Sequence, residues 1–149
     1  MKNRLRNADF FRLINVGQVI AKENPVNFLS VVADSKDSDI NFNIFGLGIK
    51  NCNQLIAYVL FSIENESSEI HSIAVDPFFR SMGFGKALLC GALTYSLNKG
   101  CKTCLLRVKV SNIAAIALYE KQNFFVGRTL KDYYNKPTED GLEMLCYLE

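Results

Sequence analysis

Residues Arg80-Ser81-Met82-Gly83-Phe84-Gly85-Lys86 join a strand-like segment to an apolar helical one. A helix N-terminus leaves its first backbone N–H groups unpaired and carries the positive end of the helix dipole, so it favours anions. Gly83 and Gly85 have no Cβ atom to hold a phosphate away from those amides. Arg80 and Lys86 add a cation at each edge. The order strand, glycine-spaced turn and helix therefore predicts a turn that binds pyrophosphate.

This spacing is less specific than two better-known phosphate motifs. No lysine-serine pair follows the second glycine, as the nucleotide P-loop requires, and the sequence does not match the G-x-G-x-x-G pattern of dinucleotide-binding folds. The alternative interpretation is a turn softened by glycine, with two solvated charges. The segments on either side of the turn favour the phosphate site over this alternative.

Length and composition favour a single domain with its own hydrophobic core. A chain of 149 residues fits one domain, residues 1–149, on a prior of roughly 100–200 residues per domain. Apolar residues make up 49% of the chain, so a core can form without disulfides or metals, and no metal site is expected. The net charge of +2 gives no argument for nucleic acid as a partner. No apolar run approaches the ~20 residues of a membrane span, so no membrane partner is expected.

The five cysteines indicate the compartment. They are odd in number and mostly lie in apolar stretches. Cys101 and Cys104 form a C-x-x-C spacing, but no second pair and no histidine stand nearby. We therefore expect reduced, buried thiols and a cytoplasmic protein.

The hydrophobic pattern predicts a mixed α/β domain. Strand patterns occupy residues 2–6, 40–49, 54–63, 69–75, 103–110, 124–130 and 142–148. Helical patterns occupy residues 8–21, 28–34, 84–98 and 113–121. A run of antiparallel strands thus precedes a strand-helix-strand-helix middle and a closing hairpin.

A composite of short motifs resembles the GNAT superfamily of acetyl-CoA-dependent N-acetyltransferases. Its parts are residues 73–77, the Arg-x-x-Gly-x-Gly turn, residues 108–121 and the pair Asn123-Phe124, in that order. Within the superfamily the chain is most similar to protein N-terminal acetyltransferases, including those that acetylate an N-terminal alanine of a ribosomal protein. Residues 70–135 carry the resemblance, and the first third of the chain follows it only in the order of its elements.

The resemblance implies a six- or seven-stranded, mixed and mostly antiparallel sheet with about four flanking helices. Strands 4 and 5, residues 69–75 and 103–110, would splay apart and hold acetyl-CoA between them. By the same likeness one set of residues would bind the cofactor. These are Ile73, Ala74 and Val75 through the pantetheine arm, Arg80, Ser81, Met82, Gly83, Phe84, Gly85 and Lys86 through the pyrophosphate, and Asn112 and Tyr119 farther along the chain. Asn112 can also act as a helix N-cap.

Acetylation of an amine needs a neutral nitrogen and an acid that protonates the departing thiolate. The resemblance assigns the acid to Tyr119, whose phenol keeps its proton at neutral pH; the alternative is a core aromatic. In the ribosomal-protein enzymes a glutamate commonly stands where this chain has Arg107, and arginine cannot accept a proton. Glu69 and His71 lie two residues apart on one strand face, so either can be the base. Capture of an already neutral amine is the third possibility.

The acceptor is expected to be the N-terminal α-amino group of a protein or peptide. Tyr133 and Tyr134 resemble the aromatic pair that walls the first residues of a bound peptide in N-terminal acetyltransferases. Glu139, Asp140 and Glu143 could attract a cationic amine, and Arg107 could help hold the cofactor or an acidic part of the acceptor. The alternatives are a small-molecule amine acetyltransferase and a CoA-binding domain with reduced activity. The sequence leaves monomer and homodimer open.

Overall fold

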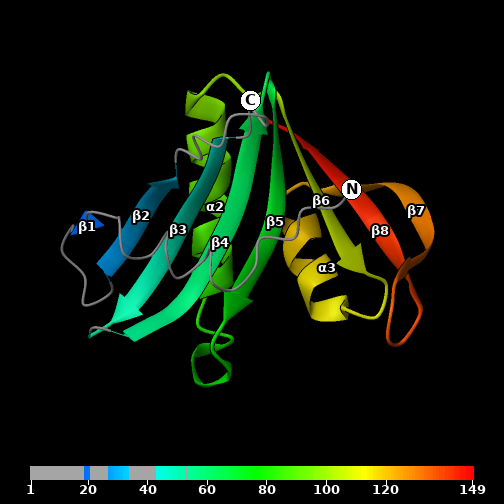
Figure 1. Ribbon diagram of the computed structural model, residues 1–149, viewed down its shortest axis with the longest axis horizontal. Helices are drawn as coiled ribbons and strands as arrows, with labels where there is room; N and C mark the ends of the chain where they lie inside the picture. The colour runs from blue at the N-terminus through cyan, green and yellow to red at the C-terminus, as the bar shows by residue number, and fades with distance from the viewer. Residues whose placement is uncertain (1–18, 21–26, 34–42, 53) are drawn as a thin grey trace.

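A computed structural model of the chain describes residues 19–20, 27–33, 43–52 and 54–149 (Figure 1). Its strands form one sheet in the order β1-β2-β3-β4-β5-β6-β8-β7. The strands are β1 (Val19–Ile20), β2 (Asn27–Ala33), β3 (Asn43–Asn51), β4 (Gln54–Glu64), β5 (Ser67–Val75), β6 (Thr103–Lys109), β7 (Phe125–Tyr134) and β8 (Glu139–Tyr147). Among these described strands, only β5 and β6 pair in parallel. The expected mixed, mostly antiparallel sheet is confirmed, with eight strands in the described residues where six or seven were expected.

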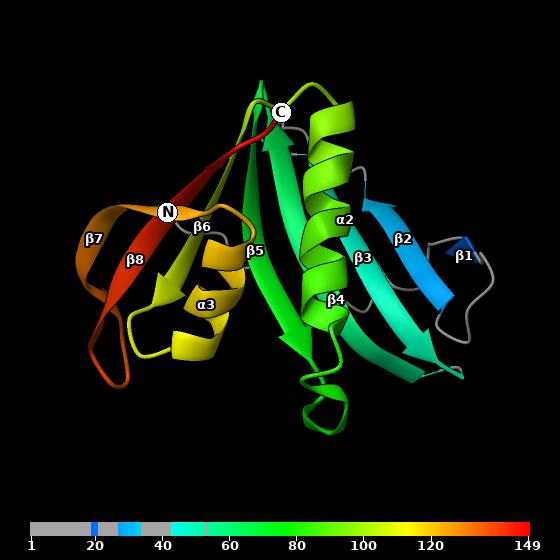
Figure 2. The same ribbon diagram turned by 180° about the vertical axis from the view of Figure 1, so that it is seen from behind.

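Two α-helices in the described residues cover one face of this sheet (Figure 2). Helix α2 (Phe84–Asn98) follows the short 3-10 helix η1 (Pro77–Phe79), and α3 (Ile113–Lys121) follows β6. The core lies between the helices and the sheet, because helix and strand residues of this face are both buried. Its largest fully buried side chains are Phe61, Ile49, Leu88, Leu89, Leu106 and Met144. No helix of the described part of the chain is long and apolar enough to cross a membrane.

One predicted helix is wrong. Residues 28–34 were expected to be helical, but Asn27–Ala33 form strand β2, which pairs with β3 from Asn27 opposite Lys50 to Ala33 opposite Ile44. Pairing with a distant strand outweighs a local helical pattern, and the β-branched pair Val31-Val32 suits a strand. Val19–Ile20, expected within a helix, form β1. The predictions for residues 2–6, 8–18 and 40–42 lie outside the described residues, and the expected four helices are not confirmed.

The middle of the sheet contains a β-bulge in β5 and a point beyond which β5 and β6 no longer pair. Leu60 of β4 lies opposite Ser72 of β5, but the next residue, Phe61, lies opposite Ile70, so His71 is the extra residue of a bulge. On the other side, β5 pairs with β6 only from Ser67 opposite Thr103 to Ile70 opposite Leu106. Beyond this point the two strands separate (Figure 1). They are the strands that were expected to splay.

Candidate active site

The diverging half of β5 leaves one backbone edge open toward β6. Ile73, Ala74 and Val75 pair with β4 on one side, but no register joins them to β6 on the other. Backbone N–H and C=O groups at such an edge can bind an extended ligand as a further strand would. The three residues expected to hold the pantetheine arm therefore line the opening between the strands.

The glycine turn stands at the end of this open edge. Gly83 is the N-cap of α2 in the left-handed conformation, with φ +86°, and no side chain of the described residues caps the helix there. Ser81 also has a positive φ, +61°. A Cβ atom at Gly83 would meet no protein atom within 4 Å, so the space beside the first turn is open. The turn thus presents free helix amides with room for an anion.

The other members of the turn have more varied surroundings. Arg80 donates from Nε to the Val75 carbonyl oxygen at 3.2 Å, which fastens the turn to the end of β5. A Cβ atom at Gly85 would lie 3.5 Å from a Leu118 methyl carbon and 3.8 Å from one of Val75. Gly85 therefore also lets α2 start close to α3. Met82 and Lys86 are exposed, whereas Phe84 packs against the core.

Helix α3 carries the two predicted residues that follow β6. The Asn112 side chain accepts a hydrogen bond from the Ala115 N–H at 3.3 Å, so it caps the helix, and its amide N–H groups remain available. Tyr119 is buried, with its ring centroid 5.9 Å from that of Phe124. Burial and the nearby Tyr134 raise the pKa of Tyr119 to about 12. Its hydroxyl, which has no hydrogen-bond partner among the described residues, keeps its proton at neutral pH.

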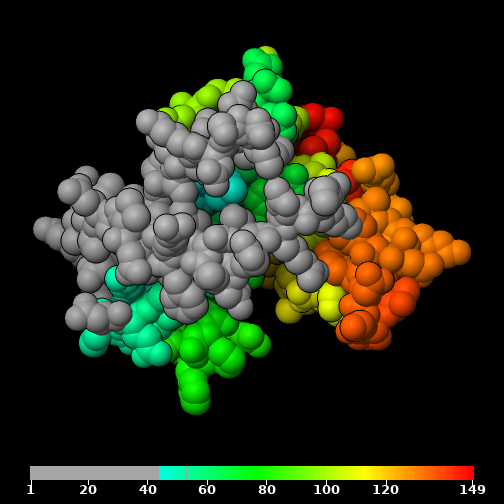
Figure 3. Space-filling view, in the orientation of Figure 1, coloured from blue at the N-terminus to red at the C-terminus, as the bar shows by residue number. Residues whose placement is uncertain are grey.

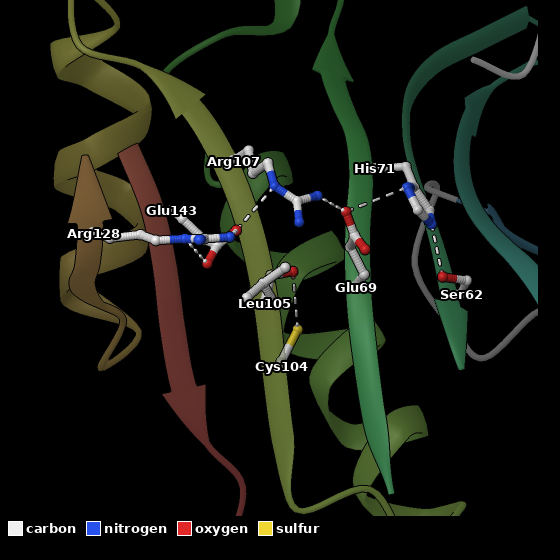
Figure 4. A network of polar contacts seen from close by, with 8 residues as sticks. All are labelled: Ser62, Glu69, His71, Cys104, Leu105, Arg107, Arg128 and Glu143. Atoms are coloured by element: carbon white, nitrogen blue, oxygen red, sulfur yellow. Dashed lines mark hydrogen bonds and ion pairs between the residues drawn. The ribbon is translucent and has the colours of Figure 1, made fainter. Parts of the chain in front are cut away.

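A chain of charged side chains crosses the sheet on the face opposite the helices (Figure 4). Arg107 of β6 forms an ion pair from Nη1 to Glu69 of β5, across the point where the strands separate. Its Nε donates to Glu143 of β8 at 3.1 Å, and Arg128 of β7 donates to the same carboxylate at 2.8 Å. Hydrogen bonds from Arg128, together with both positive charges, hold the pKa of Glu143 below its usual value.

The predicted base candidates meet at one end of this chain. His71 Nδ1 lies 3.9 Å from the Glu69 carboxylate, and His71 Nε2 lies 2.7 Å from the Ser62 hydroxyl on β4. Burial lowers the pKa of His71, Glu69 partly offsets this, and Arg107 adds to it. The histidine is therefore neutral at pH 7 and can accept a proton, whereas Glu69 is held by Arg107.

The predicted acceptor residues lie at the end of β7, and not in the expected loop. Tyr133 and Tyr134 form an edge-to-face pair with ring centroids 5.0 Å apart. A Cβ atom at Gly141 would come within 3.1 Å of Tyr134 and 3.3 Å of Tyr133, so this glycine lets both rings lie against β8. The β7–β8 hairpin forms the side of the molecule that is orange in Figure 3.

The three acidic residues of this hairpin do not form a common site. Glu139 accepts a hydrogen bond from the Ser111 N–H at 2.7 Å, and the Ser111 side chain and backbone together lower the pKa of its carboxyl group. Asp140 accepts one from the Asp132 N–H at 2.8 Å. Since Glu143 binds two arginines, each carboxylate already has a partner within the chain.

Known proteins resemble this chain in sequence and in fold. Residues 18–124, more than half of the chain, match the Acetyltransferase (GNAT) family. The chain belongs to this family. It is therefore an acetyl-CoA-dependent N-acetyltransferase, as the resemblance implied.

Relatives of this GNAT protein include bacterial N-acetyltransferases. It is 33% identical over 150 residues to the ribosomal protein bS18-alanine N-acetyltransferase of Haemophilus influenzae, covering 98% of this chain and 97% of that one. The enzyme of the same name from Escherichia coli K12 is 36% identical over 90 residues, which is 60% of each chain. The crystal structure of the E. coli ribosomal-protein-S18-alanine N-acetyltransferase aligns with a TM-score of 0.67 at 22% identity, over 97% of this chain and 91% of that one. At this identity the structural likeness concerns the fold.

Sequence reasoning missed two members of this GNAT site. Ser62 interrupts an apolar strand, and this polar residue among buried neighbours was the available signal. Arg128 gave no local signal, because it reaches Glu143 only through the register of β7 with β8. Glu143 was noted for its charge alone, and its contact with Arg107 depends on the pairing of β6 with β8.

Proposed function

We propose that this GNAT enzyme acetylates the N-terminal α-amino group of a protein, with a ribosomal protein of the bS18 type as the acceptor. The observation that carries this proposal is the 33% identity to the H. influenzae enzyme over nearly the full length of both chains. Residues 1–149 would act as one catalytic domain. We place the reaction in the cytoplasm, and the five unpaired thiols support a reducing compartment.

The cofactor would lie along the open edge of β5 with its pyrophosphate on the glycine turn. Phosphate oxygens would bind the free amides at the start of α2, and Arg80 and Lys86 would flank them. The pantetheine arm would pair with the backbone of Ile73, Ala74 and Val75, with Asn112 on its other side. The thioester would then lie near Tyr119, which is on the helix-covered face of the sheet.

The acid and the base would approach the reacting atoms from opposite faces of the sheet. Tyr119 would protonate the departing thiolate from the helix side. The acceptor amine would lose its proton on the other face, where Glu69 and His71 lie (Figure 4). Free backbone N–H groups of β5 would stabilise the tetrahedral oxyanion between them. Such an arrangement separates the two proton transfers that acetyl transfer requires.

A panel of acceptors tests the function. We expect thiol release from acetyl-CoA with peptides that begin with alanine, and a matching gain of one acetyl group at the peptide N-terminus by mass spectrometry. The same peptide with a blocked N-terminus and an internal lysine serves as the control, and it should give no product. Faster acetylation of a small polyamine than of any peptide would favour the small-molecule alternative and overturn the proposal.

A pH profile identifies the base. We expect kcat/KM to rise with pH through an acidic limb whose pKa lies below 6.5, because burial lowers the pKa of His71 and only the neutral imidazole accepts a proton. His71→Gln should remove this limb and lower kcat/KM by about 100-fold. Glu69→Gln should instead leave a limb in place, since Arg107 already holds that carboxylate. An unchanged limb in both variants would mean that the amine is captured neutral.

A further inference from the structure

Arg107 is fixed at the entrance between the diverging strands. Its Nη1 pairs with Glu69 on β5, and its Nε donates to Glu143 on β8 at 3.1 Å. These carboxylates belong to strands on opposite sides of β6, so the guanidinium plane is held from both directions. Leu106 opposite Ile70 is the last pair of the β5–β6 ladder, and Arg107 is the next residue. Figure 4 shows the guanidinium reaching across this gap.

One nitrogen of the fixed Arg107 guanidinium donates no hydrogen bond to the described residues. Among the described residues, Arg107 Nη2 has no hydrogen bond or ion pair, while Nε and Nη1 both do. The side chain is 29% exposed, so a ligand in the gap can reach it. Tyr133, one of the predicted acceptor residues, lies against Gly141, two residues before the Arg107 partner Glu143 on β8. A rigid, partly exposed donor thus stands beside the predicted acceptor wall.

Arginine can only donate hydrogen bonds, so the free Nη2 requires an oxygen on the substrate. A protein N-terminus supplies one, because the carbonyl oxygen of its first residue is three bonds from the reacting nitrogen. A simple amine has no oxygen at this position. Because a held guanidinium loses little freedom on binding, such a hydrogen bond can discriminate strongly.

We propose that Arg107 selects peptide acceptors by donating a hydrogen bond from Nη2 to the carbonyl oxygen of the acceptor's first residue. This assignment rests on the proposed N-terminal acetyltransferase function. Arg107 then binds the carbonyl oxygen of the acceptor and takes no part in proton transfer. Glu143 is then a positioning residue, since it orients Arg107 through Nε.

Two matched acceptors test the assignment in the full-length protein. One is a peptide that begins with alanine, and the other is the same peptide with its first peptide group, C(=O)–NH, replaced by CH2–CH2, which removes the oxygen. The wild-type enzyme should prefer the carbonyl form by about 10- to 100-fold in kcat/KM, the range for a hydrogen bond from a charged donor. In Arg107→Met this ratio should fall below about 3-fold, mainly through a higher acceptor KM, with KM for acetyl-CoA unchanged.

Two further variants make the comparison decisive. Lys102→Met removes a cation that lies outside this chain of contacts, because Lys102 pairs with Glu66 and its side chain is 70% exposed, and it should keep the wild-type ratio. Arg107→Lys keeps a cation between Glu69 and Glu143, so it guards against a loss of folding in the Met variant. Lysine lacks the planar fork, and its ammonium would be occupied by the two carboxylates, so we expect the ratio to fall here as well.

The possible results distinguish a failure of the Arg107 assignment from a failure of the proposed N-terminal acetyltransferase function. A wild-type ratio near one, or a ratio that both Arg107 variants leave unchanged, would overturn the inference while peptide acetylation stands. An equal loss of kcat on both acceptors would place Arg107 on the acetyl carbonyl and would also overturn it. Failure of the wild-type enzyme to acetylate any peptide, with thiol release on small amines, would overturn both.

Discussion

Replacing Tyr119 by phenylalanine is expected to lower kcat by about 10²–10⁴-fold, the usual range for one general acid or base. The substitution removes only the hydroxyl, so the ring contact with Phe124 remains and the fold should persist. The Kd for acetyl-CoA should hardly change. Because burial raises the pKa of Tyr119 to about 12, the phenol stays protonated at every pH at which the enzyme is assayed. Loss of activity at mildly alkaline pH should therefore not come from this residue.

Steady-state kinetics with a matched control checks this result. Tyr95 on α2 is a core aromatic, with its ring centroid 4.9 Å from that of Phe45, and Tyr95→Phe removes the same atom away from the gap. It should keep wild-type kcat. Turnover in Tyr119→Phe equal to that of Tyr95→Phe would show that Tyr119 is only a packing residue.

Gly83→Val is expected to weaken acetyl-CoA binding by at least about 100-fold, or ~2.7 kcal/mol. A Cβ at this position meets open space in the protein, so the added side chain would occupy the volume that the pyrophosphate needs. The positive φ of 86° adds strain that any residue except glycine meets there. Calorimetric titration with CoA measures the loss directly.

The other end of the same helix supplies the control. Gly100 has φ +89°, and a Cβ atom there also meets nothing within 4 Å. Gly100→Val therefore carries the same backbone strain at the opposite end of α2 from the glycine turn, so it should lower stability alone. Equal CoA affinity in the two variants would remove the phosphate role from the turn. Gly85 is less suitable for this test, because Leu118 lies 3.5 Å from its Cβ position.

Local signals explain which elements could be predicted from the sequence. Helices α2 and α3 have the predicted bounds, residues 84–98 and 113–121, because glycine, asparagine and lysine mark their ends. Strand β2 was missed because its identity depends on pairing with β3, and a short apolar segment fits a helix equally well. Tyr133 and Tyr134 were placed in a loop because β7 extends farther than its apolar pattern does.

The candidate site divides in the same way, into residues with local sequence signals and residues that depend on strand pairing. The glycine turn, Asn112 and Tyr119 lie within one continuous stretch, so the family resemblance could place all of them. The chain of contacts from Ser62 to Arg128 joins five strands and depends on their register, which the sequence does not contain. The bulge at His71 is equally invisible in the sequence. It puts two residues between Ile70 and Ile73, so both of these side chains pack on the core side, although plain alternation would place them on opposite faces.

Because β5 and β6 diverge, we expect binding of acetyl-CoA to change the free energy of unfolding of the protein. Among the described residues, the backbone groups of Ile73 and Ala74 that face β6 have no strand partner, so this sheet is incomplete in its interior. A ligand that pairs with this edge would supply the missing hydrogen bonds and bind only the folded chain. By mass action such a ligand raises the free energy of unfolding as its concentration rises. The acetyl-CoA concentration would then set the folded fraction of the enzyme as well as its rate.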